Sequence, residues 1–198
     1  MHTKTHRAAQ IVAVLLISLV ATQAAYVALS MAGADINRAI IWTVETLASL
    51  GIIAFAAVPL VTTRRYIAAW SAIIGAAVLN VIQLAMGVAM FPPLIEAGEP
   101  LAPVFTAVLA GAFFILYAAK FLFGYAALAI GYAEVQAGSG LAKIIGVLAT
   151  LTGIAAMIAA TIAMAFGRDA ADPYAGGLGT AAMLLLAVLL TRAVRENS

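Results

Sequence analysis

Six long apolar runs, separated by short breaks that combine charge with turn-forming residues, decide what this chain of 198 residues can fold into. Each run is long enough to cross the hydrocarbon core of a membrane as a helix, which takes about 20 residues. In lipid, every backbone N–H and C=O group needs a partner within the protein, and a helix supplies these partners by itself. We therefore predict an all-α, polytopic integral membrane protein with six transmembrane helices, at about 9–30, 39–62, 66–90, 104–133, 141–166 and 176–194.

The composition leaves little chain outside the membrane. Hydrophobic residues make up 66% of the sequence and charged residues 9%, and six spans consume roughly 120 residues. No length remains for a soluble catalytic or nucleotide-binding domain, so we treat residues 1–198 as a single transmembrane bundle. A net charge of +2 gives no basic surface of the kind that binds nucleic acid, and we expect the lipid bilayer to be the main partner.

The distribution of basic residues predicts the orientation. Seven of them fall in the loops and tails on one side of the membrane: Lys4, Arg7, Arg64, Arg65, Lys143, Arg192 and Arg195. Only Arg38 and Arg168 fall on the other side. Since cytoplasmic loops carry the excess of lysine and arginine, we predict that both termini are cytoplasmic. The alanine-rich, cysteine-free composition suits a bacterial inner (cytoplasmic) membrane.

The fourth run, 104–133, is unusually long. Its 30 residues would form a helix of about 45 Å, against a hydrocarbon core of about 30 Å, so the helix must tilt, protrude or break. Gly124 and Gly131 share one face of it, and Gly146 and Gly153 share one face of the fifth run. Small residues allow two helices to approach closely, so we expect these faces to pack.

Two charges lie deep within the runs, Glu45 in the second and Lys120 in the fourth. An unpaired charge near the bilayer centre costs about 2.5–3.5 kcal/mol on insertion scales, so such residues face the bundle interior and usually mark a pathway or relay. Counting from the span centres places Asn80 and Gln83 of the third run at a similar depth. We expect Glu45 and Lys120 to form a coupled, titrating pair within this polar layer.

Two aromatic residues extend the candidate site. Trp42 lies one turn from Glu45 and either lines a pocket or anchors its helix at the interface. Tyr117 shares a predicted helical face with Lys120, where its hydroxyl can form a hydrogen bond. A structural role stays open for the same residues, because buried amides often join helices and a buried ion pair can fix helix register.

Other chemistry finds no support in the sequence. Cysteine is absent, which excludes a thiolate metal site or thiol nucleophile, and the two histidines, His2 and His6, lie in the N-terminal tail. No Walker A, dinucleotide-binding or H-E-x-x-H motif occurs. We therefore predict no cofactor, no metal and no assignable catalytic residue.

Three functions remain after these exclusions. The first is a small membrane transporter or ligand-binding membrane protein with a polar, proton-coupled site in mid-bilayer. The second is a non-catalytic accessory subunit that packs against other membrane proteins or against a second copy of itself. The third is an intramembrane enzyme acting on a lipid, with Glu45 as general base or Lys120 as acid or nucleophile.

Overall fold

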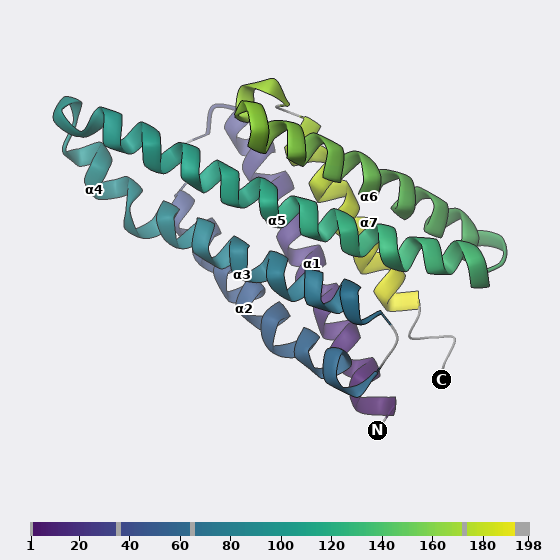
Figure 1. Ribbon diagram of the computed structural model, residues 1–198. Helices are drawn as coiled ribbons and strands as arrows, with labels where there is room; N and C mark the ends of the chain where they lie inside the picture. The colour runs from purple at the N-terminus through teal and green to yellow at the C-terminus, as the bar shows by residue number, and fades with distance from the viewer. Residues whose placement is uncertain (1, 35–36, 64–65, 172–173, 193–198) are drawn as a thin grey trace.

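The computed structural model describes residues 2–34, 37–63, 66–171 and 174–192, which form helices and connecting turns and no strand (Figure 1). The helices are α1 (His2–Met31), α2 (Arg38–Thr62), α3 (Ile67–Ala89), α4 (Phe91–Glu96), α5 (Ala102–Ala137), α6 (Gly140–Phe166) and α7 (Tyr174–Arg192), with short 3-10 helices η1 (Glu99–Leu101) and η2 (Arg168–Ala170).

The prediction of six transmembrane helices is confirmed. Within the described residues, six helical stretches are long and apolar enough to cross a membrane, and each contains or closely matches one predicted span. The chain is therefore an integral membrane protein of the all-α class. Arg64, Arg65 and Arg195, together with the last two residues of the sixth predicted span, lie outside the described residues.

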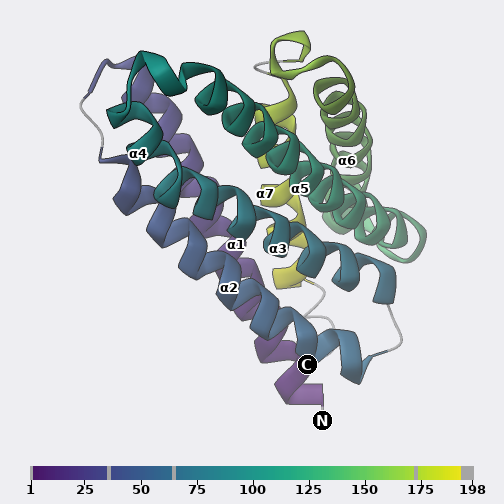
Figure 2. The ribbon, with the colours of Figure 1, turned by 60° about the vertical axis from the view of Figure 1, so that its left-hand side comes forward.

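Five of the long helices form a closed ring. In it, α1 packs on α2, α2 on α3, α3 on α5, α5 on α7, and α7 on α1. The sixth long helix, α6, packs on α5 and α7 outside this ring (Figure 2). The start of α1 and the end of α7 lie at the same end of the bundle, which we call the terminal side (Figure 1).

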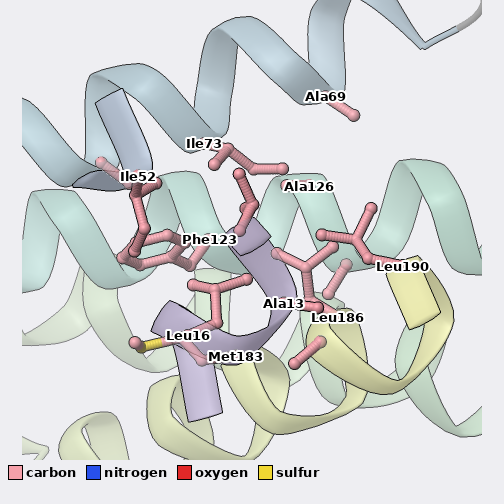
Figure 3. Packing of buried hydrophobic residues seen from close by; sticks show 14 of the residues in the cluster. Ala13, Leu16, Ile52, Ala69, Ile73, Phe123, Ala126, Met183, Leu186 and Leu190 are labelled. Atoms are coloured by element: carbon pink, nitrogen blue, oxygen red, sulfur yellow. The ribbon is translucent and has the colours of Figure 1, made fainter. Parts of the chain in front are cut away.

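Apolar side chains fill the ring between its centre and the terminal side. Leu16 of α1, Ile52 of α2, Phe123 of α5 and Leu186 of α7 belong to one buried cluster, and each is at most 2% exposed. Figure 3 shows the Phe123 ring beside Leu16 and Ile52, so side chains from three helices meet there. The lumen at this level is therefore packed with side chains.

The connection between the third and fourth spans is more ordered than its four prolines and two glutamates suggest. It folds into α4 and η1, and α5 begins at Ala102, two residues before the predicted start. Pro92 and Pro93 lie in the first turn of α4, where a proline is tolerated because that turn lacks intrahelical N–H bonds. The helix α5 continues unbroken over 36 residues, about 54 Å, so the long fourth span does not break.

The predicted glycine faces do pack against each other. A Cβ atom at Gly124 of α5 would lie 2.9 Å from the carbonyl oxygen of Gly153 of α6, and one at Gly131 would lie 2.8 Å from that of Gly146. The two pairs are seven residues apart on each helix and run in opposite directions, as expected for an antiparallel pair. This close approach fixes α6 on the outside of α5.

Candidate functional site

Glu45 is buried on the inner face of α2. Its side chain is 6% exposed, and the Thr22 hydroxyl of α1 donates a hydrogen bond of 2.8 Å to its Oε1 atom. Among the described residues, no protein donor reaches the second carboxylate oxygen. Glu45 is thus a largely dehydrated acid with one protein partner on the neighbouring helix.

Lys120 is buried even more completely, at 3% exposed. Its ammonium group donates to Oε1 of Gln23 in α1 at 2.6 Å, to the Thr180 hydroxyl of α7 at 3.0 Å and to the Met183 sulfur of α7 at 3.5 Å. The Thr180 hydroxyl also lies 2.8 Å from Oε1 of Gln23, within donating distance. Three acceptors thus surround an ammonium group that has three protons.

A glycine in α7 makes this arrangement possible. A Cβ atom at Gly179 would lie 2.8 Å from Cγ and 2.9 Å from Cβ of Lys120, so the aliphatic chain passes directly over this residue. The helices α1 and α5 flank α7 on its two sides in the ring. The lysine side chain can therefore cross α7 and reach Gln23, because Gly179 has no side chain in its path.

The expected direct pairing of Glu45 with Lys120 is not formed. Within the described part of the chain, the ion pair shorter than 4.0 Å joins Arg168 to Asp169, on the surface. Glu45 and Lys120 interact electrostatically over a longer distance, and each has its own hydrogen-bond partner on α1. The reason is the order of the ring, which separates α2 from α5 by α3 on one side and by α1 and α7 on the other.

Two adjacent residues of α1 connect the charged groups. Thr22 binds Glu45 and Gln23 binds Lys120, so consecutive side chains hold opposite charges at one level of the bundle. We call Thr22, Gln23, Glu45, Lys120 and Thr180 the polar cluster. Leu16 lies seven residues from Gln23 on α1, and Ile52 lies seven residues from Glu45 on α2, both toward the terminal side. The apolar core therefore closes the ring on that side of the polar cluster.

Asn80 and Gln83, both predicted to lie in the polar layer, have different surroundings. Asn80 is 4% exposed, and its amide donates to the hydroxyl of the fully buried Ser49 of α2 at 2.9 Å. Gln83 is half-buried and forms no hydrogen bond with the described residues. Asn80 and Ser49 therefore join α3 to α2, whereas Gln83 has unused hydrogen-bonding capacity.

Trp42 packs at the side of the cluster away from the termini. Two of its ring carbons would lie 3.0 Å from a Cβ atom at Gly87, so the indole fills the space that this glycine leaves on α3. Its ring contacts Phe91 edge to face at 6.0 Å between centroids, and Phe91 contacts Phe105 in the same way at 5.5 Å. A row of three aromatic rings thus lies beyond Glu45.

Tyr117 lies one turn from Lys120 on α5 but packs among apolar residues. It is 3% exposed, belongs to an apolar cluster with alanines of α6 and α7, and stacks on Phe113 at 6.1 Å. Residues three apart on a helix differ in direction by about 60°, which directs Tyr117 toward α6 while Lys120 reaches α7 and α1. Tyr117 therefore packs beside α6, whereas the ammonium group of Lys120 binds residues of α1 and α7.

Sequence reasoning missed Thr22, Gln23 and Thr180, the partners of the two buried charges. Each is uncharged, and a hydroxyl or amide in an apolar run is common enough to attract little attention. The adjacent pair Thr22 and Gln23 did carry a signal, because it places two polar side chains together late in the first run. The same depth count that aligned Glu45 with Gln83 would have found it.

Other features of the described residues lie apart from the polar cluster. A shallow groove of about 330 Å³ on α1 is lined by Arg7, Gln10, Ile11, Val14 and Leu15. No group of three or more histidine, cysteine, aspartate or glutamate side chains able to hold a metal ion occurs among the described residues.

Comparison with known proteins gives no relative: no protein-family model, curated protein or solved structure significantly matches this chain.

Proposed function

We propose that this protein is a small membrane transporter or ligand-binding membrane protein whose polar cluster is a proton-coupled site. The observation that carries the proposal is the separate burial of two opposite charges. Glu45 and Lys120 are both buried, and each has its own neutral partner on α1. A purely structural ion pair would be expected to hold its partners in contact, since direct contact is what offsets the cost of burial.

The asymmetry of the ring supports the same proposal. Apolar side chains fill the ring on the terminal side of the polar cluster, whereas half-buried Gln83 and Trp42 lie level with Glu45 or beyond it. Such an arrangement suits a site that is reached from the side opposite the termini and closed toward the terminal side. In our proposal both termini face the cytoplasm of a bacterium, so the site opens away from the cytoplasm.

The roles of the site residues follow from their contacts. Glu45 binds a proton or a cationic group, and Lys120 balances its charge. Gln83 and Trp42 line the approach to Glu45, Asn80 holds α2 and α3 together through Ser49, and Tyr117 supports α5 where it packs on α6. The lipid bilayer is the solvent for the outer surface of the bundle.

The test is proton flux into proteoliposomes driven by a potassium diffusion potential and followed with an enclosed pH-sensitive dye. We expect the wild type to admit protons faster than protein-free liposomes. Glu45→Gln and Lys120→Met should fall to the protein-free rate. The matched controls Glu99→Gln and Lys143→Met, which alter exposed residues of the same types, should keep the wild-type rate.

Two outcomes would contradict the proposal. A wild-type rate equal to that of protein-free liposomes would exclude proton coupling. Equal rates in the wild type and Glu45→Gln would show that any flux bypasses the polar cluster. Either result, combined with a second membrane protein that co-purifies in fixed ratio, would favour an accessory subunit instead.

A further inference from the structure

The two buried charged groups share one feature. Each is hydrogen-bonded to a threonine hydroxyl that has a second acceptor within reach. The Thr22 hydroxyl lies 2.8 Å from Glu45 and also 3.0 Å from the carbonyl oxygen of Leu19. A hydroxyl has a single hydrogen to donate and lone pairs with which to accept. It can therefore donate to Glu45 or to Leu19 while its oxygen stays in place.

The Thr180 hydroxyl repeats this arrangement at Lys120. It accepts a hydrogen bond from the ammonium group at 3.0 Å and has two acceptors for its own hydrogen, Oε1 of Gln23 at 2.8 Å and the carbonyl oxygen of Gly176 at 2.9 Å. The backbone carbonyl is again the alternative acceptor, on the preceding turn of the same helix. The two halves of the polar cluster thus have the same construction.

We infer that the polar cluster is a proton-binding site in which Thr22 and Thr180 keep Glu45 and Lys120 hydrogen-bonded in both of their protonation states. This inference deepens the proposed function, and it rests on that function only for the link between proton binding and transport. The ligand is a proton from water. A buried polar group that loses its hydrogen bond on changing its protonation state is destabilised by desolvation, and this arrangement avoids that loss.

The exchange at Glu45 needs only a rotation of one hydroxyl. With the carboxylate ionised, Thr22 donates to Oε1. When water delivers a proton, an O–H bond forms on the carboxyl group, the Thr22 hydrogen turns to the Leu19 carbonyl, and the acid donates to the Thr22 oxygen. No electron is transferred, and a water molecule remains from the hydronium ion.

At Lys120 the same rotation runs in the other direction. Loss of a proton to water breaks one N–H bond and leaves its electron pair on Nζ. The Thr180 hydrogen then turns from its carbonyl acceptor toward this lone pair, while the two remaining N–H groups face Gln23 and Met183. Each ion is therefore able to change charge without a rearrangement of the helices.

The charges near the cluster are few. Glu45 and Lys120 act on each other, and at their level the described parts of α1, α3 and α7 contribute the neutral Thr22, Gln23, Asn80 and Thr180. Apart from Glu45 and Lys120, the charged residues and histidines of the packed helices lie near helix ends: His2, Lys4, His6 and Arg7 on α1, Arg38 on α2, Glu134 on α5, Lys143 on α6 and Arg192 on α7. Glu45 and Lys120 are thus the pair that sets the proton occupancy of the cluster.

Infrared spectroscopy of the purified protein in lipid nanodiscs, recorded across a pH range, tests the Glu45 half. We expect a protonated-carboxyl band that titrates in the wild type and is missing in Glu45→Gln. Thr22→Val, which keeps the shape of the side chain but removes the hydroxyl, should move this band to higher wavenumber. Thr22→Ser should leave it near the wild-type position. No Glu45-dependent band at any pH, or a band unmoved in Thr22→Val, would overturn the inference.

The titration of Lys120 provides a second test of the inference, which remains available if Thr22→Val fails to fold. The chain has three lysines, so a sample labelled with ¹³C at Cε gives three signals that Lys4→Arg and Lys143→Arg assign. We expect the titration of the Lys120 signal to shift in Thr180→Val and to return toward wild type in Thr180→Ser. Equal titration curves in wild type and Thr180→Val would overturn the inference.

A negative result in the spectroscopy and a negative result in the flux assay would reject different claims. Hydroxyl-dependent titration without proton flux would leave the proton-binding site in place and reject transport. Flux that is lost in Glu45→Gln, together with spectra indifferent to Thr22 and Thr180, would keep transport and reject the role of the hydroxyls.

Discussion

Gly179 of α7 lies directly beneath the aliphatic chain of Lys120 of α5, close enough that a single added carbon would collide with it. The contact lets the ammonium group cross one helix and bind Gln23 on the next. The position of the buried charge therefore depends on a residue that has no side chain. The sequence interval between the two residues, from 120 to 179, gave no indication of this relationship.

Gly179→Ala should destabilise the protein by about 1–3 kcal/mol, the usual cost of overpacking a buried site. The added Cβ atom forces the Lys120 side chain to move and weakens its bond to Gln23. The unfolding midpoint in detergent measures this loss. Gly177→Ala is the matched control on the same helix, because a Cβ atom there meets nothing within 4 Å. Similar midpoints for the two variants would show that Lys120 tolerates displacement.

The glycine contacts between α5 and α6 give a second prediction. Gly153→Ala places a carbon against the backbone of Gly124 and Leu128, and a backbone cannot move aside as a flexible side chain does. We expect a loss of about 1–3 kcal/mol in the same unfolding assay. Gly111→Ala on α5, whose Cβ atom would meet only the Met86 methyl group at 3.7 Å, should behave as wild type.

Double-mutant cycles should show that the charged residues are coupled more strongly to α1 than to each other. We expect a coupling free energy of about 0.5 kcal/mol or more between Lys120→Met and Gln23→Leu, and between Glu45→Gln and Thr22→Val. These pairs are in contact, whereas Glu45 and Lys120 are not. A coupling between Glu45→Gln and Lys120→Met that exceeded both would indicate a direct ion pair.

The predicted orientation is testable by single-cysteine labelling, since the chain contains no cysteine of its own. Ala97→Cys is exposed after α4, and Ser139→Cys is exposed in the turn between α5 and α6, at the terminal side. With cytoplasmic termini, a membrane-impermeant maleimide added to intact bacterial cells should label Ala97→Cys alone. It should label Ser139→Cys only after the cells are permeabilised, and the reverse pattern would invert the topology.

Much of the fold was predictable because lipid imposes strong constraints on sequence. A span must be long, apolar and helical, so the six runs could be found by length and hydropathy alone. The glycine spacing at Gly124, Gly131, Gly146 and Gly153 also indicated which faces of two neighbouring helices approach closely. By contrast, the four prolines between the third and fourth spans gave no indication of helix, because the sequence does not show that they lie in first turns, where helices accept proline.

The candidate site was predictable only in part. The cost of burying a charge marked Glu45 and Lys120, and both are buried, as is Asn80. Helical periodicity then grouped Tyr117 with Lys120, although the two residues face different neighbours. The partners Thr22, Gln23 and Thr180 carried no comparable cost and therefore no comparable signal.

The sequence by itself determined that this chain is a membrane protein, how many times it crosses the membrane, and which two charged residues must face away from lipid. Each of these follows from the local free energy of placing a residue in hydrocarbon. Only the tertiary structure decided the order of helices around the ring. That order depends on how side-chain surfaces fit together over the whole bundle. It separates Glu45 from Lys120 and makes two consecutive residues of α1 the partners of both.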